Sequence, residues 1–175
     1  MTKLVLLKQL KEFTEERVKD LLLPVAQQKE DEEPPKDRPA EVYRARLPDS
    51  RAAKKKAPYI LHQVITGKDA QSPGNPSISL VTVRTVFCVY HKDEQEGGLA
   101  LLNLMERLRI AMLEEGIVGG QFILDREAGL ESLVYPDNTA PYYTGEMISV
   151  WKLPIIERKV PYAQEHNWNG AGIRR

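Results

Sequence analysis

Few side chains in this sequence have the types and spacing that catalysis or metal binding requires. The histidines, His62, His91 and His166, lie far apart, and no pair has the spacing of a metal site. The single cysteine, Cys88, lies in an apolar run, where we expect a small buried side chain rather than a nucleophile, because nothing near it in the sequence would lower its pKa. We therefore predict that the chain is not an enzyme and that it binds no metal and no cofactor.

One basic segment is the sharpest concentration of charge. Its residues are Arg44, Arg46, Arg51, Lys54, Lys55 and Lys56. At this density the segment could contact phosphates or an acidic protein surface, and the alternative is a flexible, solvated loop. Aromatic residues do not alternate with these bases, which argues against sequence-specific recognition of RNA. We predict that the segment lines a channel or contacts a partner.

The overall composition is that of a globular chain without a dominant charge. Its 25 basic and 25 acidic residues give a formal net charge of zero, so no global field attracts it to DNA or to a membrane. No apolar stretch reaches the length of about 18 residues that a membrane span needs. A single cysteine cannot form an internal disulfide, so the fold does not depend on an oxidising compartment. The short apolar run at the N-terminus is followed at once by Lys8, Lys11 and Glu12, unlike a signal peptide, so we expect a protein that is made and used in the cytoplasm.

The N-terminal part of the sequence predicts one helix and a linker. Apolar residues at three- and four-residue steps, from Leu6 to Leu21, indicate a helix over residues 4–23 that ends before Pro24. Residues 27–39 are charged and proline-rich, and they cannot bury enough apolar surface to fold. We expect them to form a mobile linker.

Three strands are predicted before a second helix. Residues 41–47 alternate, with Tyr43, Ala45 and Leu47 on one face, and residues 58–66 read as a strand followed by a loop over 67–77. Residues 78–90 give the strongest signal. One face of this strand carries Val81, Val83, Phe87 and Val89. Its other face is also largely apolar, so we expect a central strand or one whose second face a partner buries.

The second half of the sequence predicts a helix and three further strands. A helix over residues 98–115 has an apolar stripe and would end at Gly116. The stripe consists of Leu101, Met105, Leu108 and Met112. Residues 121–126 and 130–135 should pair as a hairpin, because the three-residue link between them contains a glycine. A last strand is predicted over residues 142–153.

This order of elements predicts an α+β fold with a single mixed or antiparallel sheet and two helices packed on one face. We expect one domain over residues 1–154. The remaining residues, 155–175, are polar and glycine-rich, and we expect them to form an extended C-terminal tail.

The arrangement resembles the tail terminator, or tail completion, proteins of long-tailed bacteriophages. The similarity covers roughly residues 59–154: a long strand, an acidic turn with glycines, the helix GLALLNLMERLRIAML, a hairpin and the closing strand ISVWKLP. It is a similarity of pattern rather than of one invariant motif. The charged linker before residue 59 and the tail after residue 154 depart from the family.

The resemblance implies a non-enzymatic subunit that forms a hexameric ring. Such a ring caps the tail tube, ends its polymerisation and joins the tail to the head. The implied partners are other copies of the chain, the tail tube protein, the head connector protein and the DNA that passes through the ring, with no membrane partner. The implied location is the head-proximal end of the virion tail, after assembly in the host cytoplasm.

Other functions remain as alternatives. The chain could be a head–tail connector (neck) protein, a small enzyme with an inward-facing pair of carboxylates, or a regulatory or nucleic-acid-binding module. A mass measurement in solution separates the two assembly proteins from the others, because a ring needs many copies of the chain.

Overall fold

The computed structural model of the chain describes residues 2–27, 33, 35–48, 50–71, 77–136 and 140–156. Within these residues it contains two α-helices, one short 3-10 helix and seven strands. The helices are α1 (Lys3–Val18), η1 (Ser50–Lys56, the 3-10 helix) and α2 (Glu94–Glu115). The strands are β1 (Glu41–Arg44), β2 (Tyr59–Ala70), β3 (Ile78–Tyr90), β4 (Ile117–Val118), β5 (Phe122–Leu124), β6 (Leu130–Val134) and β7 (Tyr142–Lys152).

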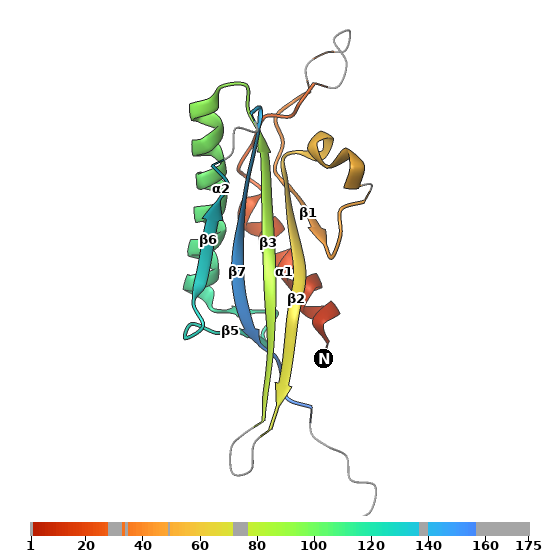
Figure 1. The fold of residues 1–175 in the computed structure, drawn as a ribbon, viewed down its shortest axis with the longest axis vertical. Coiled ribbons are helices and arrows are strands. Elements are labelled where there is room, and N and C mark those ends of the chain that lie inside the picture. Colours follow the sequence, from red (N-terminus) through yellow and green to blue (C-terminus); the bar gives the residue numbers. More distant parts are fainter. Residues whose placement is uncertain are drawn as a thin grey trace, which may run out of the picture.

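The strands belong to one sheet with the order β1-β2-β3-β7-β5-β4, and β6 also pairs with β7 (Figure 1). β1 runs parallel to β2, whereas the other neighbours are antiparallel. α1 packs on β1 and β2, and α2 packs on β3 and β7, on the same face of the sheet. We call this the inner face and the opposite one the outer face. The predicted α+β fold is therefore confirmed.

Helix α1 is shorter than predicted, because it ends at Val18 rather than near residue 23. Leu23 leaves the helix and forms a backbone bridge with Arg38, with N···O distances of 2.9 and 3.1 Å. Pro24 disfavours helical backbone at the residue before it. The bridge also places the side chain of Leu23 in the core, where it is buried.

Two segments that the sequence predicts to be mobile fall partly, for the linker, or mostly, for the tail, outside the described residues. The residues outside the description are 28–32 and 34 in the linker and 157–175 in the tail. Their predicted mobility therefore stays a prediction. Arg38, near the end of the linker, is an exception because the bridge to Leu23 fixes its backbone.

Strand β1 ends at Arg44, earlier than predicted, because Ala45 has a φ of 61° that does not continue a strand. Its predicted apolar face is partly wrong. Tyr43 and Leu47 pack on the outer face of the sheet, whereas Val42 points the other way and enters the main core. Burial on both faces explains why simple alternation does not identify the side that faces the helices.

Strands β2 and β3 form a long hairpin that extends past the helices at one end of the molecule (Figure 1). β2 continues to Ala70, which pairs with Ile78, so the predicted strand over 58–66 is too short and the predicted loop over 67–77 is too long. Residues 72–76 lie outside the described residues. β3 has the predicted bounds. Its predicted inner-face residues are buried: Val81, Val83, Phe87 and Val89.

Helix α2 begins at Glu94, earlier than predicted. Asp93 caps it, because its side chain accepts a hydrogen bond from the Glu96 amide at 2.9 Å. Gly97 lies inside the helix, where a Cβ atom would come within 2.1 Å of the Tyr143 ring. The glycine pair indicates a turn in the sequence, but Gly97 instead permits close packing between α2 and β7.

The C-terminal end of α2 and its buried stripe match the prediction. Gly116 has a left-handed φ of 65°, and its amide donates to the carbonyl oxygen of Met112 at 2.9 Å. The buried residues on the inner face include the predicted set, Leu101, Met105, Leu108 and Met112.

The predicted hairpin between residues 121–126 and 130–135 is wrong. β5 and β6 both pair with β7, one after the other along the same edge: Leu124 lies opposite Trp151, and Leu130 lies opposite Ser149. The turn between them contains Gly129 at φ 80°, but the chain resumes its original direction. The long edge of β7 offers a partner to both segments and overrides the local turn signal.

Candidate interaction surface

The basic residues identified in the sequence lie at the β1 side of the sheet. Arg44 ends β1 and Arg46 follows it, whereas the side chain of Arg51 lies outside the described residues. The lysines belong to η1 and are Lys54, Lys55 and Lys56. The end of η1, with its lysines, lies beside the start of β1, whereas Arg44 and Arg46 lie at the end of that strand. The length of β1, about 10 Å, therefore separates the lysines from the arginines. The structure thus groups the lysines in a short helix rather than in the predicted loop.

Arg38 holds η1 against the sheet. Its guanidinium donates to the carbonyl oxygens of Lys56 at 3.0 Å and Pro58 at 3.3 Å, and it pairs with Glu41 at 3.2 Å. Carbonyl groups at the end of a helix lack intrahelical donors, so the arginine satisfies groups that would otherwise need water. The sequence does not reveal this role, because Arg38 lies in the charged segment that is predicted to be a linker.

A cluster of tyrosines lies beneath η1 on the outer face. Tyr43 meets the buried Tyr59 edge to face at 6.3 Å, and the rings of Tyr90 and Tyr142 are 5.4 Å apart. The Lys54 ammonium lies 5.6 Å from the centre of the Tyr142 ring, which is a cation–π distance. The sequence shows no aromatic residues among the bases because these tyrosines come from four separate strands.

Cys88 is buried in the same cluster. Burial raises the pKa of its thiol to about 11, although a hydrogen bond with Tyr59 and the charge of Lys54 act in the opposite direction. The group is therefore a protonated thiol at neutral pH. Cys88 is a packing residue, as the sequence predicts.

Beyond η1 the outer face opens into a groove of about 440 Å³ beside β6. Its lining residues are Glu131, Ser132, Leu133, Glu146 and Ile148. Leu133 is 52% exposed, so an aliphatic side chain borders the groove on the solvent side. Nothing in the alternation of β6 alone indicates this groove, because it forms between β6 and β7.

The two carboxylates of the groove differ in their surroundings. Glu146 accepts a hydrogen bond from Arg84, which also donates to the Tyr135 hydroxyl at 3.3 Å. Burial raises the pKa of Glu146, but hydrogen bonds from Tyr135 and Arg84 outweigh it and hold that pKa below its usual range. Glu131 forms no ion pair with any residue that the structure describes. The groove therefore carries a negative charge without an internal partner.

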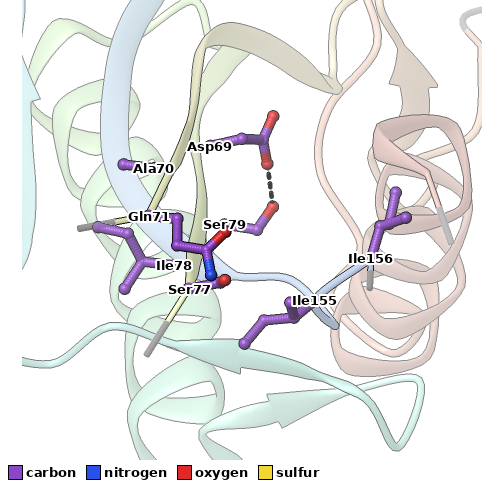
Figure 2. Close-up of a pocket in the computed structure, with 8 residues that line it drawn as sticks. All are labelled: Asp69, Ala70, Gln71, Ser77, Ile78, Ser79, Ile155 and Ile156. Atoms are coloured by element: carbon purple, nitrogen blue, oxygen red, sulfur yellow. Dashed lines mark hydrogen bonds between the residues drawn. The ribbon is translucent and has the colours of Figure 1, made fainter. Parts of the chain in front are cut away.

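A second hollow, of about 300 Å³, lies at the end of the β2–β3 hairpin (Figure 2). Ile78 from β3 and Ile155 and Ile156 after β7 form its apolar border. The Ser79 hydroxyl donates to the Asp69 carboxylate at 2.5 Å. The described residues that line the hollow include no histidine, cysteine or cation.

His62 lies buried between two threonines on the inner face. Its ring nitrogens are each 2.9 Å from a hydroxyl, one of Thr14 and one of Thr85. A neutral imidazole donates at one nitrogen and accepts at the other, which fits these contacts, and burial lowers the pKa of His62 to about 3. His91 contacts the backbone of Asp93, and His166 lies outside the described residues.

In the described part of the chain, no group of three or more histidine, cysteine, aspartate or glutamate side chains could hold a metal ion. None of the described helices is long and apolar enough to cross a membrane. In comparisons with known proteins, no family model matches the chain and no curated protein matches it significantly.

Proposed function

We propose that this chain is a structural subunit of a phage tail, which assembles into a hexameric ring, caps the tail tube, ends its polymerisation and joins the tail to the head. The observation that carries the proposal is the open outer face of the sheet. Beyond η1, this face presents the partly exposed aliphatic residues Leu80, Ile148 and Val150. Apolar surface that a subunit's own elements do not cover is typical of an interface.

The resemblance of residues 59–154 to tail terminators supplies the kind of assembly and the number of copies. The tail tube protein and the head connector protein are then the partners at the two ends of the ring, and DNA passes through its opening. The ring belongs to the head-proximal end of the virion tail. The bases at the β1 side serve either the opening or a contact between proteins.

The surroundings of the reactive side chains support a structural role. The Cys88 thiol is buried and stays protonated at neutral pH because its pKa is raised. His62 is enclosed by threonine hydroxyls and stays neutral. Both side chains are occupied by packing and hydrogen bonding, so neither is available to a substrate.

Native mass spectrometry of the full chain, alone and with the tail tube protein, tests the proposal. We expect a hexamer in at least one condition, together with an arrest of tube growth. A monomer in both conditions at high concentration would refute the ring. A complex with the head connector that leaves tube growth unchanged would favour the neck protein instead.

A further inference from the structure

We propose that the open edge of β6 pairs with the open edge of β1 from a second copy of this chain, so that subunits join head to tail through a continuous sheet. The inference rests on the proposed function, because it names the surfaces through which the copies in the ring would meet. Three observations support the strand contact: unpaired backbone groups at the two edges, opposite charges near them, and the directions of β1 and β6.

Among the described residues, no lysine, proline, bulge or further strand protects the outer edge of β6, and its one charged residue is Glu131. Proteins block exposed edges with lysine, proline, bulges or covering segments. β6 has the sequence LESLV, its register with β7 is continuous, and residues 131–134 are exposed. Because the Tyr135 amide donates to Thr144 on β7, the alternate amides of Ser132 and Val134 point away from β7. These amides and their carbonyl groups form a short, open ladder.

β1 offers a second edge on the opposite side of the sheet, which is open except at the Arg44 carbonyl, where the Arg46 amide donates at 2.7 Å. Glu41 and Ala45 donate their amides to carbonyl groups of the β2 segment, so the amides of Val42 and Arg44 point away from β2. Among the described residues, no strand pairs with this side of β1. The two edges have different sequences, so their pairing is head to tail, and such contacts close into a ring when the rotation permits.

The charges at the two edges are complementary. Within the described residues the bases at the β1 side form no ion pairs: Arg44, Arg46, Lys54, Lys55 and Lys56. At the β6 side, Glu131 likewise forms no ion pair with another described residue. The strand registers place Glu131 level with the end of β1, where Arg44 and Arg46 lie, so a continuous sheet brings this carboxylate close to these two bases. The zero net charge of the chain adds no general repulsion between copies.

The strand directions fit the proposed ring. β1 and β2 run in one direction, β3 in the opposite one, β7 again with β2, and β6 with β3. β1 and β6 of one subunit are therefore antiparallel to each other. A rotation about an axis along the strands keeps these directions, so β1 of one copy meets β6 of the next in antiparallel pairing. Antiparallel pairing is the slightly more stable kind.

A proline substitution tests the backbone contact. Val134→Pro removes an outward amide but leaves the hydrogen bonds between β6 and β7, and edge strands tolerate proline at such positions. The control, Val134→Ala, keeps the amide. We expect sedimentation velocity of the full chain, alone and with the tube protein, to show assembly by the control and at least about tenfold weaker assembly by the proline variant. Equal assembly by both variants would overturn the proposal.

A charge exchange tests the partner. Glu131→Lys and Arg46→Glu should each weaken assembly, and the double variant should recover most of it, because the exchanged charges attract again. An unchanged thermal midpoint in each variant confirms that the fold is intact. If Arg46→Glu instead weakens binding to duplex DNA and leaves the mass distribution unchanged, the bases contact DNA and the proposal is wrong.

The same measurements separate this inference from the proposed function. If the wild-type chain caps tubes and the variants assemble as well as the wild type, the terminator function is supported and the strand contact is refuted. If the chain assembles through these edges but does not stop tube growth, the strand contact is supported and the proposed function is refuted. A wild-type chain that stays monomeric alone and with tubes would refute both.

Discussion

The inner and outer faces of the sheet draw on the same strands but differ in how the chain covers them. On the inner face, α1 and α2 enclose a core that includes Phe87, Leu108 and Trp151, each with 0% of its surface exposed. On the outer face, η1 covers one end above Tyr59 and Cys88. The centres of β3 and β7 remain half-exposed there.

This difference indicates that stability and assembly depend on different faces. Substitutions on the inner face should change the free energy of unfolding of the isolated subunit. Substitutions on the outer face and at the sheet edges should act mainly on association between chains. The following predictions test this division, beginning with the largest expected effect.

The inner core should show the largest loss of stability. We expect Leu108→Ala to lower the free energy of unfolding by about 2–5 kcal/mol, because it leaves a cavity between α2 and the sheet. Leu102→Ala on the same helix is the control, since Leu102 is 46% exposed and should cost about 0.5 kcal/mol or less. Urea unfolding measures both. Similar losses in the two variants would mean that the buried face of α2 is assigned wrongly.

His62 should make the inner core sensitive to acid. The pKa of His62 is about 3 in the folded chain against an ordinary value of 6.5, so in this interval the unfolded chain binds a proton that the folded chain does not. Its stabilising contribution is complete above pH 6.5 and falls on acidification towards pH 3, by at most about 1.4 kcal/mol per pH unit. Unfolding between about pH 7 and 5 should therefore depend more on pH in the wild type than in His62→Gln. Parallel pH profiles would contradict this.

Loss of Arg38, which holds η1 on the outer face, should lower the free energy of unfolding less than a cavity in the inner core does. Arg38→Met removes the donors to Lys56 and Pro58, and we expect a loss of about 1–3 kcal/mol with faster amide exchange in η1. Arg46→Met, at an exposed position, is the control and should leave both quantities unchanged. If η1 exchanges at the same rate in both variants, Arg38 is not its anchor.

The η1 lysines should contribute least to stability. Replacing Lys54, Lys55 and Lys56 with glutamine should change the free energy of unfolding by about 1 kcal/mol or less, mostly through the contact of Lys54 with Tyr142. The corresponding arginine variant keeps the charge and serves as the control. Thermal unfolding measures both, and a loss as large as that of Leu108→Ala would show that η1 belongs to the folding core.

Elements with a strong local pattern could be predicted from the sequence. β3 is rich in β-branched residues, and the stripe of α2 repeats with the helical period, so neither depends on knowledge of distant partners. The pairing of β6 depends on the length of the β7 edge, which no local pattern encodes. The end of α1 depends on the bridge between Leu23 and Arg38, which lie on either side of the linker.

The same distinction applies to the candidate site. The η1 lysines are adjacent in the sequence, so their clustering could be predicted. The tyrosines beneath them and the groove at Glu131 arise from strands that meet only in the folded sheet. Conversely, Arg44 and Arg46 are close to the lysines in the sequence but lie at the far end of β1.

The position of β7 also affects how the chain folds during synthesis. β7 is the last described element to be translated, yet it lies between β3 and both β5 and β6. Until the ribosome has released it, the emerging chain has no neighbour for the long edge of β3, and Trp151 is missing from the core. Nascent chains should therefore expose an apolar strand edge until β7 has emerged, and such edges attract chaperones or other nascent chains.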